Sequence, residues 1–209
     1  MSSQKDYCFI YIVRHGETDW NTQGIIQGQL DTPLNRQGEQ QARDVGEMLQ
    51  GITFDAVFSS DLVRAKRTAE IIALERKLEV KTTQLLREQH FGRFQGRPRQ
   101  EFLKLFVHWN ELSEAEKFSY TVADEESNEQ AVSRMLTFLR EASLANIGKT
   151  ILVVAHGALM RYLLIKLGEA TFSQPKFMKN AGYIKLHSDG IEFFVDQIVG
   201  VEERRKTKD

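Results

Sequence analysis

Two segments of the chain share a pattern that few folds can accommodate. Residues 10–16 read IYIVRHG and residues 151–157 read ILVVAHG, so each is an apolar run that stops at a His-Gly pair. Unbroken aliphatic runs are typical of parallel strands that are buried on both faces. Ligands of open α/β sheets bind beyond the carboxyl ends of such strands, where a glycine lets the backbone turn or a ligand approach. The pattern therefore predicts that His15 and His156 lie together over one site, with Arg14 beside the first.

The rest of the chain alternates short apolar runs with amphipathic segments. Helical periodicity begins at residues 35–36 and 60–61, runs from 127 to 145, and resumes after His156. Strands are predicted over residues 9–13, 56–58, 78–82 and 150–155. This alternation predicts an α/β three-layer sandwich with a mostly parallel central sheet and helices on both faces. Residues 182–186 and 191–195 alternate around a Ser-Asp-Gly turn, which predicts a closing hairpin.

The length of 209 residues fits a single domain. Residues from about 97 to 126 have a broken and polar helical pattern, so we expect a small helical lid insertion there. The tail at residues 202–209 is a run of charges, which predicts disorder.

Composition and charge exclude several classes of function. The formal net charge is −1, so no nucleic acid or anionic membrane is expected as a partner. Cys8 is the single cysteine, which rules out an intrachain disulfide. The sequence lacks both a secretory leader pattern and an apolar stretch of about 20 residues, so a cytoplasmic location is expected. The sequence does not indicate whether the protein forms oligomers.

Three features of the sequence suggest other kinds of site, but the residues around them do not fit those sites. Cys8 and Arg14 have the C-x5-R spacing of cysteine phosphatases, but the residues between them favour an extended strand over a phosphate-cradling loop. Residues 148–150 read GKT like the end of a P-loop, but they precede a strand instead of following one. The histidines lack the spacings of a metal site, which leaves a metallohydrolase as an open but disfavoured alternative.

Six motifs in a fixed order resemble the histidine phosphatase (phosphoglycerate mutase-like) superfamily. They extend from about residue 10 to residue 187, and their order is far more specific than a lone Arg-His-Gly. The motifs are Arg14-His15-Gly16-Glu17-Thr18 with Trp20-Asn21; Gln27-Gly28 with Asp31-x-Pro33-Leu34; Ser59-Ser60-Asp61-Leu62-x-Arg64-Ala65; Leu86-x-Glu88-x-x-x-Gly92-x-x-x-Gly96; Glu126-Ser127 with Arg134; and His156-Gly157.

The resemblance implies phosphoryl transfer through a phosphohistidine at His15. Imidazole is a competent nucleophile near neutral pH, and the planar fork of arginine can bind two phosphoryl oxygens at once. Glu88 is expected to be the general acid and base, although a loop glutamate can also be merely solvated. The resemblance calls for neither a metal nor a cofactor. The expected oxygen-binding residues are Arg14, Arg64 and His156, and the expected substrate-binding residues are Asn21, Gln27, Gly28 and Gly157.

The sequence favours the phosphatase branch. The mutase branch carries an Arg-Arg-Ser-Tyr-Asp type motif in its lid, and residues 97–127 lack one, so water should take the phosphoryl group. The expected substrate is a small phosphorylated metabolite, with a sugar phosphate or bisphosphate favoured. A phosphoglycerate mutase and a non-enzymatic pseudophosphatase that binds a phosphorylated ligand remain alternatives.

Two features of the lid region bear on the substrate. Many relatives have two glycines before the Glu-Ser pair that starts the long helix, where this chain has Asp124 and Glu125 before Glu126-Ser127. The added negative charge is unfavourable beside a phosphate unless these carboxylates point away, so we expect the size of the substrate or the geometry of the pocket rim to differ from the common pattern. Arg93, Arg97 and Arg99 could bind a second phosphate or face water, and the sequence does not decide between the two.

Overall fold

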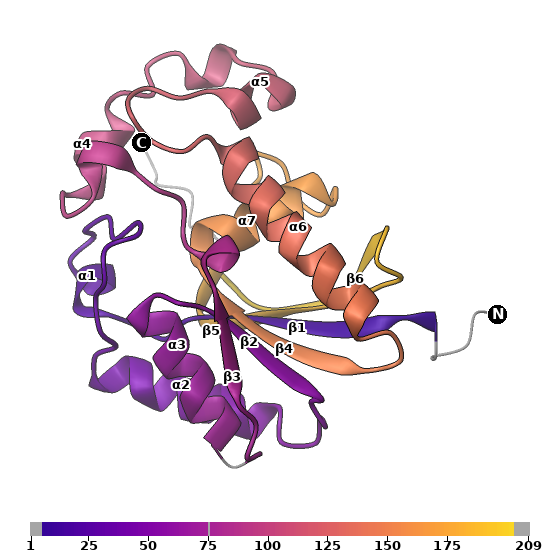
Figure 1. The fold of residues 1–209 in the computed structure, drawn as a ribbon. Helices are drawn as coiled ribbons and strands as arrows, with labels where there is room; N and C mark the ends of the chain where they lie inside the picture. The colour runs from indigo at the N-terminus through magenta and orange to yellow at the C-terminus, as the bar shows by residue number, and fades with distance from the viewer. Residues whose placement is uncertain (1–5, 75, 203–209) are drawn as a thin grey trace.

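The protein, described here by a computed structural model of residues 6–74 and 76–202, is built on a six-stranded sheet (Figure 1). The strand order is β3-β2-β4-β1-β5-β6. The pairs β1–β4, β2–β4 and β2–β3 are parallel, whereas β5 pairs antiparallel with both β1 and β6. The predicted mostly parallel sheet is thus confirmed. The strands are β1 (Cys8–Arg14), β2 (Ala56–Ser60), β3 (Val80–Thr83), β4 (Thr150–Ala155), β5 (Phe177–Ser188) and β6 (Phe193–Glu202).

The register of the two central strands brings the two His-Gly pairs together. Arg14 of β1 lies opposite Ala155 of β4, and the His15 amide donates to the Ala155 carbonyl over 3.0 Å. Because both strands run in the same direction and end at the same level, His15 and His156 emerge side by side at one edge of the sheet. This is the juxtaposition that the sequence pattern predicts.

Helices cover both faces of the sheet, which explains why the central strands are apolar without interruption. Ile10 and Ile12 belong to the core under α6 and α7, while Tyr11 and Val13 belong to the core over α2 and α3. Figure 1 shows the two helix pairs on opposite sides of the strands, which completes the predicted three-layer sandwich. The helices are α2 (Arg36–Met48), α3 (Val63–Leu74), α6 (Asn128–Ala145) and α7 (Gly157–Lys166).

The helix starts follow from capping side chains. Asn35 caps α2 by accepting from the Gly38 amide over 2.8 Å, and Ser127 begins α6 with a capping box. The apolar residues Ala42, Val45, Met48 and Leu49 recur at helical spacing in the sequence, but the side chain of Met48 is 61 % exposed and does not face the core. At about 100° per residue, Met48 lies roughly a quarter-turn away from the stripe that Val45 and Leu49 form.

The closing hairpin is present and longer than predicted. Its strands β5 and β6 extend to Phe177 at one end and to Glu202 at the other. Glu202, which the charge pattern placed in the tail, is the last residue of β6, and residues 203–209 lie outside the described part of the chain.

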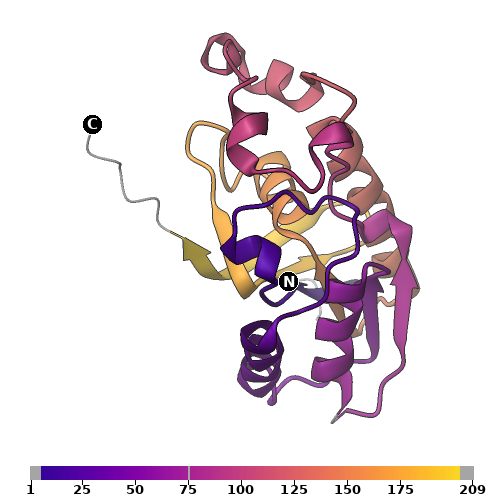
Figure 2. The same ribbon diagram turned by 90° about the vertical axis from the view of Figure 1, so that its left-hand side faces the viewer.

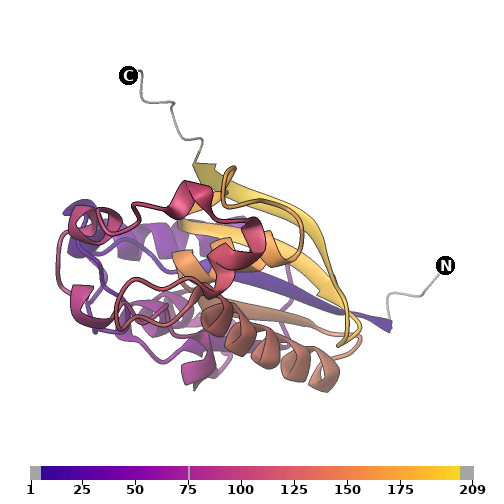
Figure 3. The ribbon, with the colours of Figure 1, turned by 90° about the horizontal axis from the view of Figure 1, so that it is seen from above.

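Segment 97–126 carries only short helices, as its broken pattern suggests. These are α4 (Arg99–Leu103), the 3₁₀ turn η4 (Trp109–Glu111) and α5 (Glu114–Ser119). Phe94 and Phe102 form a small separate core there with Ile26. Figures 2 and 3 show the segment at the top of the molecule, near α1 (Asp19–Thr22). No helix of the described residues combines the length and the apolar character that crossing a membrane requires.

Candidate active site

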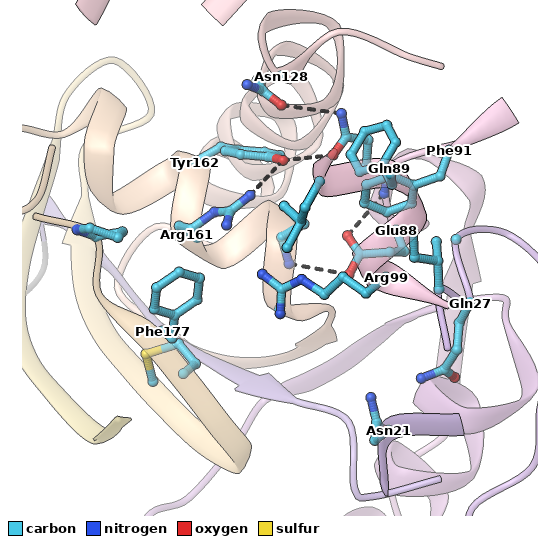
Figure 4. A pocket seen from close by; sticks show the side chains of 18 of the residues that line it. Asn21, Gln27, Glu88, Gln89, Phe91, Arg99, Asn128, Arg161, Tyr162 and Phe177 are labelled. Carbon is cyan, nitrogen blue, oxygen red and sulfur yellow. Dashed lines mark hydrogen bonds between the residues drawn. The ribbon is translucent and has the colours of Figure 1, made fainter. Parts of the chain in front are cut away.

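A pocket of about 570 Å³ opens where β1 and β4 end (Figure 4). Charged and polar groups line it together with aromatic side chains. The charged and polar lining includes Arg14, His15, Asn21, Gln27, Gly28, Arg64, Glu88, Arg99, Gly157 and Arg161, and the aromatic wall consists of Phe91, Phe102, Phe106, Trp109, Tyr120, Phe172 and Phe177.

Both glycines of the His-Gly pairs are required by close approach. A Cβ atom on Gly16 would lie 2.3 Å from the carbonyl oxygen of Gly38, a backbone atom that cannot move aside. A Cβ atom on Gly157 would lie 3.0 Å from Nε of Arg14. The first glycine therefore lets the segment after β1 pack against the first turn of α2, and the second lets the Arg14 guanidinium lie against the start of α7.

His15 is held in one tautomer with its reactive nitrogen free. Its Nδ1 lies 2.6 Å from the Gly16 carbonyl oxygen, and a carbonyl only accepts, so Nδ1 carries the proton. Burial, together with the charges of Arg64 and Arg14, lowers the pKa of His15 well below its usual value, against a smaller opposing effect of that hydrogen bond. The imidazole is therefore neutral at pH 7, with an unprotonated Nε2.

Two arginines flank this imidazole, one fully buried and one half-buried. Arg64 is fully buried in the first turn of α3, and its guanidinium donates to the carbonyls of Leu30 and Gly28 over 2.8 and 2.6 Å. Burial lowers the pKa of Arg64 to about 10, so it stays charged at pH 7. Arg14 donates to the Met178 carbonyl. Gly28 thus orients Arg64 through its backbone oxygen.

His156 packs against His15, with ring centroids 5.2 Å apart. It is fully buried, and burial together with the Arg64 charge lowers the pKa of His156 well below its usual value. Within the described residues, neither of its ring nitrogens has a hydrogen-bond partner, nor does Nε of Arg14 or Arg64. Unpartnered buried polar atoms are costly, and here they converge on one place, which suits a bound anion.

Glu88 lies at the N-terminus of α7, across from the arginines. One carboxylate oxygen accepts from the Ala158 amide over 3.1 Å, and the other accepts from the Gln89 amide over 2.9 Å. Arg134 holds the backbone of this loop by donating to the Glu88 carbonyl over 3.0 Å, and it pairs with Glu126 over 2.7 Å. The Glu88 carboxylate is thereby fixed at the pocket wall.

The carboxylates of residues 124–126 are engaged by other groups of the protein. Asp124 accepts from the Arg93 amide over 3.2 Å. The Glu125 side chain lines the pocket, but its two oxygens accept from the amides of Val122 and Ala123 over 2.7 and 2.8 Å. With Glu126 bound to Arg134, all three carboxylates have partners away from the phosphate side.

The remaining predicted substrate-binding residues also line the pocket. Asn21 uses its amide oxygen to accept from the Thr18 amide over 3.1 Å, which leaves its amino group available. The Gln27 amide oxygen accepts from the Thr32 hydroxyl. The Gly157 amide lies in the first turn of α7, where amides have no partner within the helix.

The structure distinguishes which of the other candidate residues line the pocket and which do not. Of the three lid arginines, Arg99 lines the pocket, and Arg97 pairs with Glu101 over 3.8 Å. Cys8 is buried in the core, and burial raises the pKa of its thiol to about 12, which removes it as a nucleophile. The described residues contain no group of three or more His, Cys, Asp or Glu side chains that could hold a metal ion.

The sequence motifs missed several pocket residues. Tyr162 donates its hydroxyl hydrogen to Gln89 over 2.6 Å, and Asn180 donates to the His15 carbonyl over 3.0 Å. Arg161 follows Gly157 by four residues, a spacing that could have placed it on the pocket face of the predicted helix.

Comparison with known proteins identifies the family. The chain matches the histidine phosphatase superfamily (branch 1) over residues 10–199 and belongs to it. This superfamily comprises phosphatases and phosphoglycerate mutase-like proteins, both of which occur among the relatives described next.

Three relatives illustrate the range. The chain is 35 % identical over 158 residues to the uncharacterized phosphatase PhoE of Bacillus subtilis, covering 76 % of each chain. It is 40 % identical over 165 residues to phosphoglycerate mutase-like protein 4 of Arabidopsis thaliana, covering 78 % of this chain and 72 % of that one. The solved structure of a mycobacterial glucosyl-3-phosphoglycerate phosphatase in complex with VO3 superposes with a TM-score of 0.77 at 28 % identity, covering 93 % of this chain and 99 % of that one.

Proposed function

We propose that the protein is a metal-independent phosphomonoesterase that hydrolyses small phosphorylated metabolites through a phosphohistidine at His15. The observation that carries the proposal is a neutral imidazole with a free Nε2, flanked by Arg14 and Arg64, whose Nε atoms have no hydrogen-bond partner within the described residues. Transfer of a dianionic phosphoryl group requires an unprotonated nucleophile and positive charge around the phosphoryl oxygens.

The reaction has two steps. Nε2 of His15 attacks phosphorus and the bond to the ester oxygen breaks, while a protonated Glu88 gives its proton to the leaving oxygen. Glu88 then takes a proton from water as that water attacks phosphohistidine, which releases phosphate and restores His15. Arg14, Arg64 and His156 bind the equatorial oxygens, together with the Asn21 side chain. The Gly157 amide, Gln27 and Gly28 complete the binding site.

Phosphatase activity is favoured over mutase activity by the segment above the pocket. Residues 97–127 lack the basic and aromatic motif of the mutase branch, so water reaches the intermediate. Segment 97–126 serves as the lid and selects the substrate. The mycobacterial relative is a glucosyl-3-phosphoglycerate phosphatase, which supports a small phosphorylated metabolite as substrate.

A phosphate-release screen tests the proposal. Purified protein is assayed on sugar phosphates, phosphoglycerates, nucleotides and phosphoamino acids, with and without a chelator. We expect release that survives chelation and is abolished in His15→Ala, with Arg140→Gln, an exposed arginine of α6, as the control. Substantial activity in His15→Ala, or loss on chelation, would contradict the mechanism.

Two further outcomes would support the alternatives. Interconversion of 3- and 2-phosphoglycerate faster than phosphate release, and dependent on the bisphosphate, would identify a mutase. Tight phosphate binding without hydrolysis of any compound would identify a pseudophosphatase.

A further inference from the structure

The buried polar atoms without partners point to a second place in the pocket. Within the described residues, such side-chain atoms occur in four residues only: Arg14, Arg64, His156 and Arg161. The first three surround His15 and are accounted for by the transferred phosphoryl group. Arg161 is not, because its guanidinium belongs to the next turn of α7.

The geometry of α7 places Arg161 above the phosphate site. Gly157, Ala158 and Arg161 all line the pocket, because residues three and four apart share one face of a helix. Along the helix axis, Arg161 lies about 6 Å from Gly157, at 1.5 Å per residue. The two positions are thus separated by about the length of a short carbon chain.

Arg161 is held rigidly, as Figure 4 shows. Its guanidinium carbon lies 4.7 Å from the ring centroid of Tyr162 and 5.3 Å from that of Phe177. One of its nitrogens donates to the Tyr162 hydroxyl over 2.8 Å. That hydroxyl donates to Gln89, whose amino group donates to the Asn128 amide oxygen over 3.1 Å. The guanidinium therefore loses little conformational entropy when it binds a ligand.

The charge of Arg161 is not neutralised by the protein. In the part of the chain that the structure describes, its contacts are the Tyr162 hydroxyl and two aromatic rings, and none of them is a carboxylate. Among the described residues, the acidic side chains that line the pocket are Glu88, Glu125 and Glu202. Glu88 and Glu125 accept from backbone amides, and the charge of Glu202 acts to raise the pKa of Arg14. Arg161 is half-buried, and within the described residues its Nε is buried without a hydrogen-bond partner, so an anionic group at this place would satisfy an otherwise unpaired donor.

We propose that Arg161 binds a second anionic group of the substrate, and that the preferred substrates are phosphomonoesters whose leaving part carries a carboxylate or a second phosphate. The inference rests on the proposed function of the same pocket. The aromatic wall, including Phe106, Trp109 and Phe172, covers the carbon chain between the two anionic groups.

Matched substrate pairs test this subsite. 3-Phosphoglycerate is compared with glycerol 3-phosphate, and fructose 1,6-bisphosphate with fructose 6-phosphate, so that one arm probes a carboxylate and the other a second phosphate. p-Nitrophenyl phosphate serves as a substrate without a second anion. The variants are Arg161→Gln and Arg161→Lys, with Arg140→Gln as a control on the exposed face of α6.

Arg161→Gln should lower kcat/KM by about 10- to 100-fold for at least one of the substrates with a second anionic group, as expected for losing a hydrogen bond between charged groups. For the substrates without a second anionic group, Arg161→Gln should change kcat/KM by no more than about threefold. Arg161→Lys should retain part of the preference because the charge remains.

An equal loss on all substrates would assign Arg161 a structural role and overturn the proposal, as would no loss on any of them. Failure of the proposed function is distinguishable, because it would appear as hydrolysis that persists in His15→Ala. If wild-type protein hydrolyses nothing, calorimetric binding of 3-phosphoglycerate to wild type and Arg161→Gln decides the subsite, and equal affinities overturn it.

Discussion

Replacing the Glu88 carboxyl by an amide separates proton donation from binding. Glu88→Gln keeps the size of the side chain, and its amide oxygen can still accept from one of the two amides that now hold the carboxylate, Ala158 or Gln89. The other amide loses its acceptor, which costs about 1–3 kcal/mol if the group stays dry. The variant should therefore fold, with a lowered Tm, and should lack only the proton that the leaving oxygen requires.

The loss should depend on the leaving group. General acid catalysis contributes about 10²–10⁴-fold, so kcat for an alkyl phosphate such as glycerol 3-phosphate should fall by that factor. p-Nitrophenolate leaves without protonation, so kcat for its phosphate should fall by less than about tenfold in the step that forms phosphohistidine. Single-turnover kinetics measures that step without interference from hydrolysis of the intermediate.

The comparison of the two substrates decides the role of Glu88. Glu129→Gln is the matched control, because Glu129 is an exposed carboxylate on α6 that pairs with Lys166 over 3.9 Å. Equal losses on both substrates would refute proton donation and assign Glu88 to binding or to the position of α7. An unchanged rate on the alkyl substrate would exclude Glu88 from the reaction altogether.

Further predictions concern the phosphate side of the pocket. Gly157→Ala should displace the Arg14 guanidinium and lower kcat/KM by about 10²-fold. Gly51→Ala is the control, because a Cβ atom there has nothing within 4 Å, and it should leave kcat/KM unchanged. Equal kcat/KM values for the two variants would contradict the close contact between Gly157 and Arg14. The free energy of unfolding in urea should fall as the pH drops below 6.5, by up to about 1.4 kcal/mol per pH unit for each of His15 and His156, because the unfolded chain takes up protons that the folded chain excludes. An unchanged pH slope in His156→Gln would refute the buried neutral state. Tungstate at about 100 times its Kd should stabilise the protein by about 2.7 kcal/mol, and this gain should vanish in Arg14→Met; a gain that persists would place the anion elsewhere.

The central strands could be predicted because burial on both faces leaves a direct mark in the sequence. Ile10, Tyr11 and Ile12 are all apolar since alternate residues enter cores on opposite sides of the sheet. The residues at which helices and strands end are less clearly marked in the sequence. Met48 looks equivalent to Leu49 in a list of apolar residues, and Glu202 continues β6 because pairing with Phe177 extends the strand into a charged stretch.

The gathering of the motif residues around His15 could be predicted because these residues lie within short motifs at the ends of elements. Arg64 is the example, since its position in the first turn of a helix is unfavourable for a cation unless an anion binds there. The part of the pocket that Tyr162, Gln89 and the aromatic wall form could not be predicted from the sequence. Tyr162 and Gln89 are 73 residues apart and meet only through folding, and the aromatic wall comes from several segments whose apolar residues resemble ordinary core.

The central claim is that His15 carries the phosphoryl group during turnover. Its most direct test is rapid acid-free quenching of the enzyme with substrate, followed by peptide mass spectrometry. We expect a phosphoryl adduct on the His15 peptide that is stable to alkali, labile to acid, formed within one turnover, and absent from His15→Ala. Turnover at full rate without any adduct on His15, or an adduct on another residue, would contradict the mechanism.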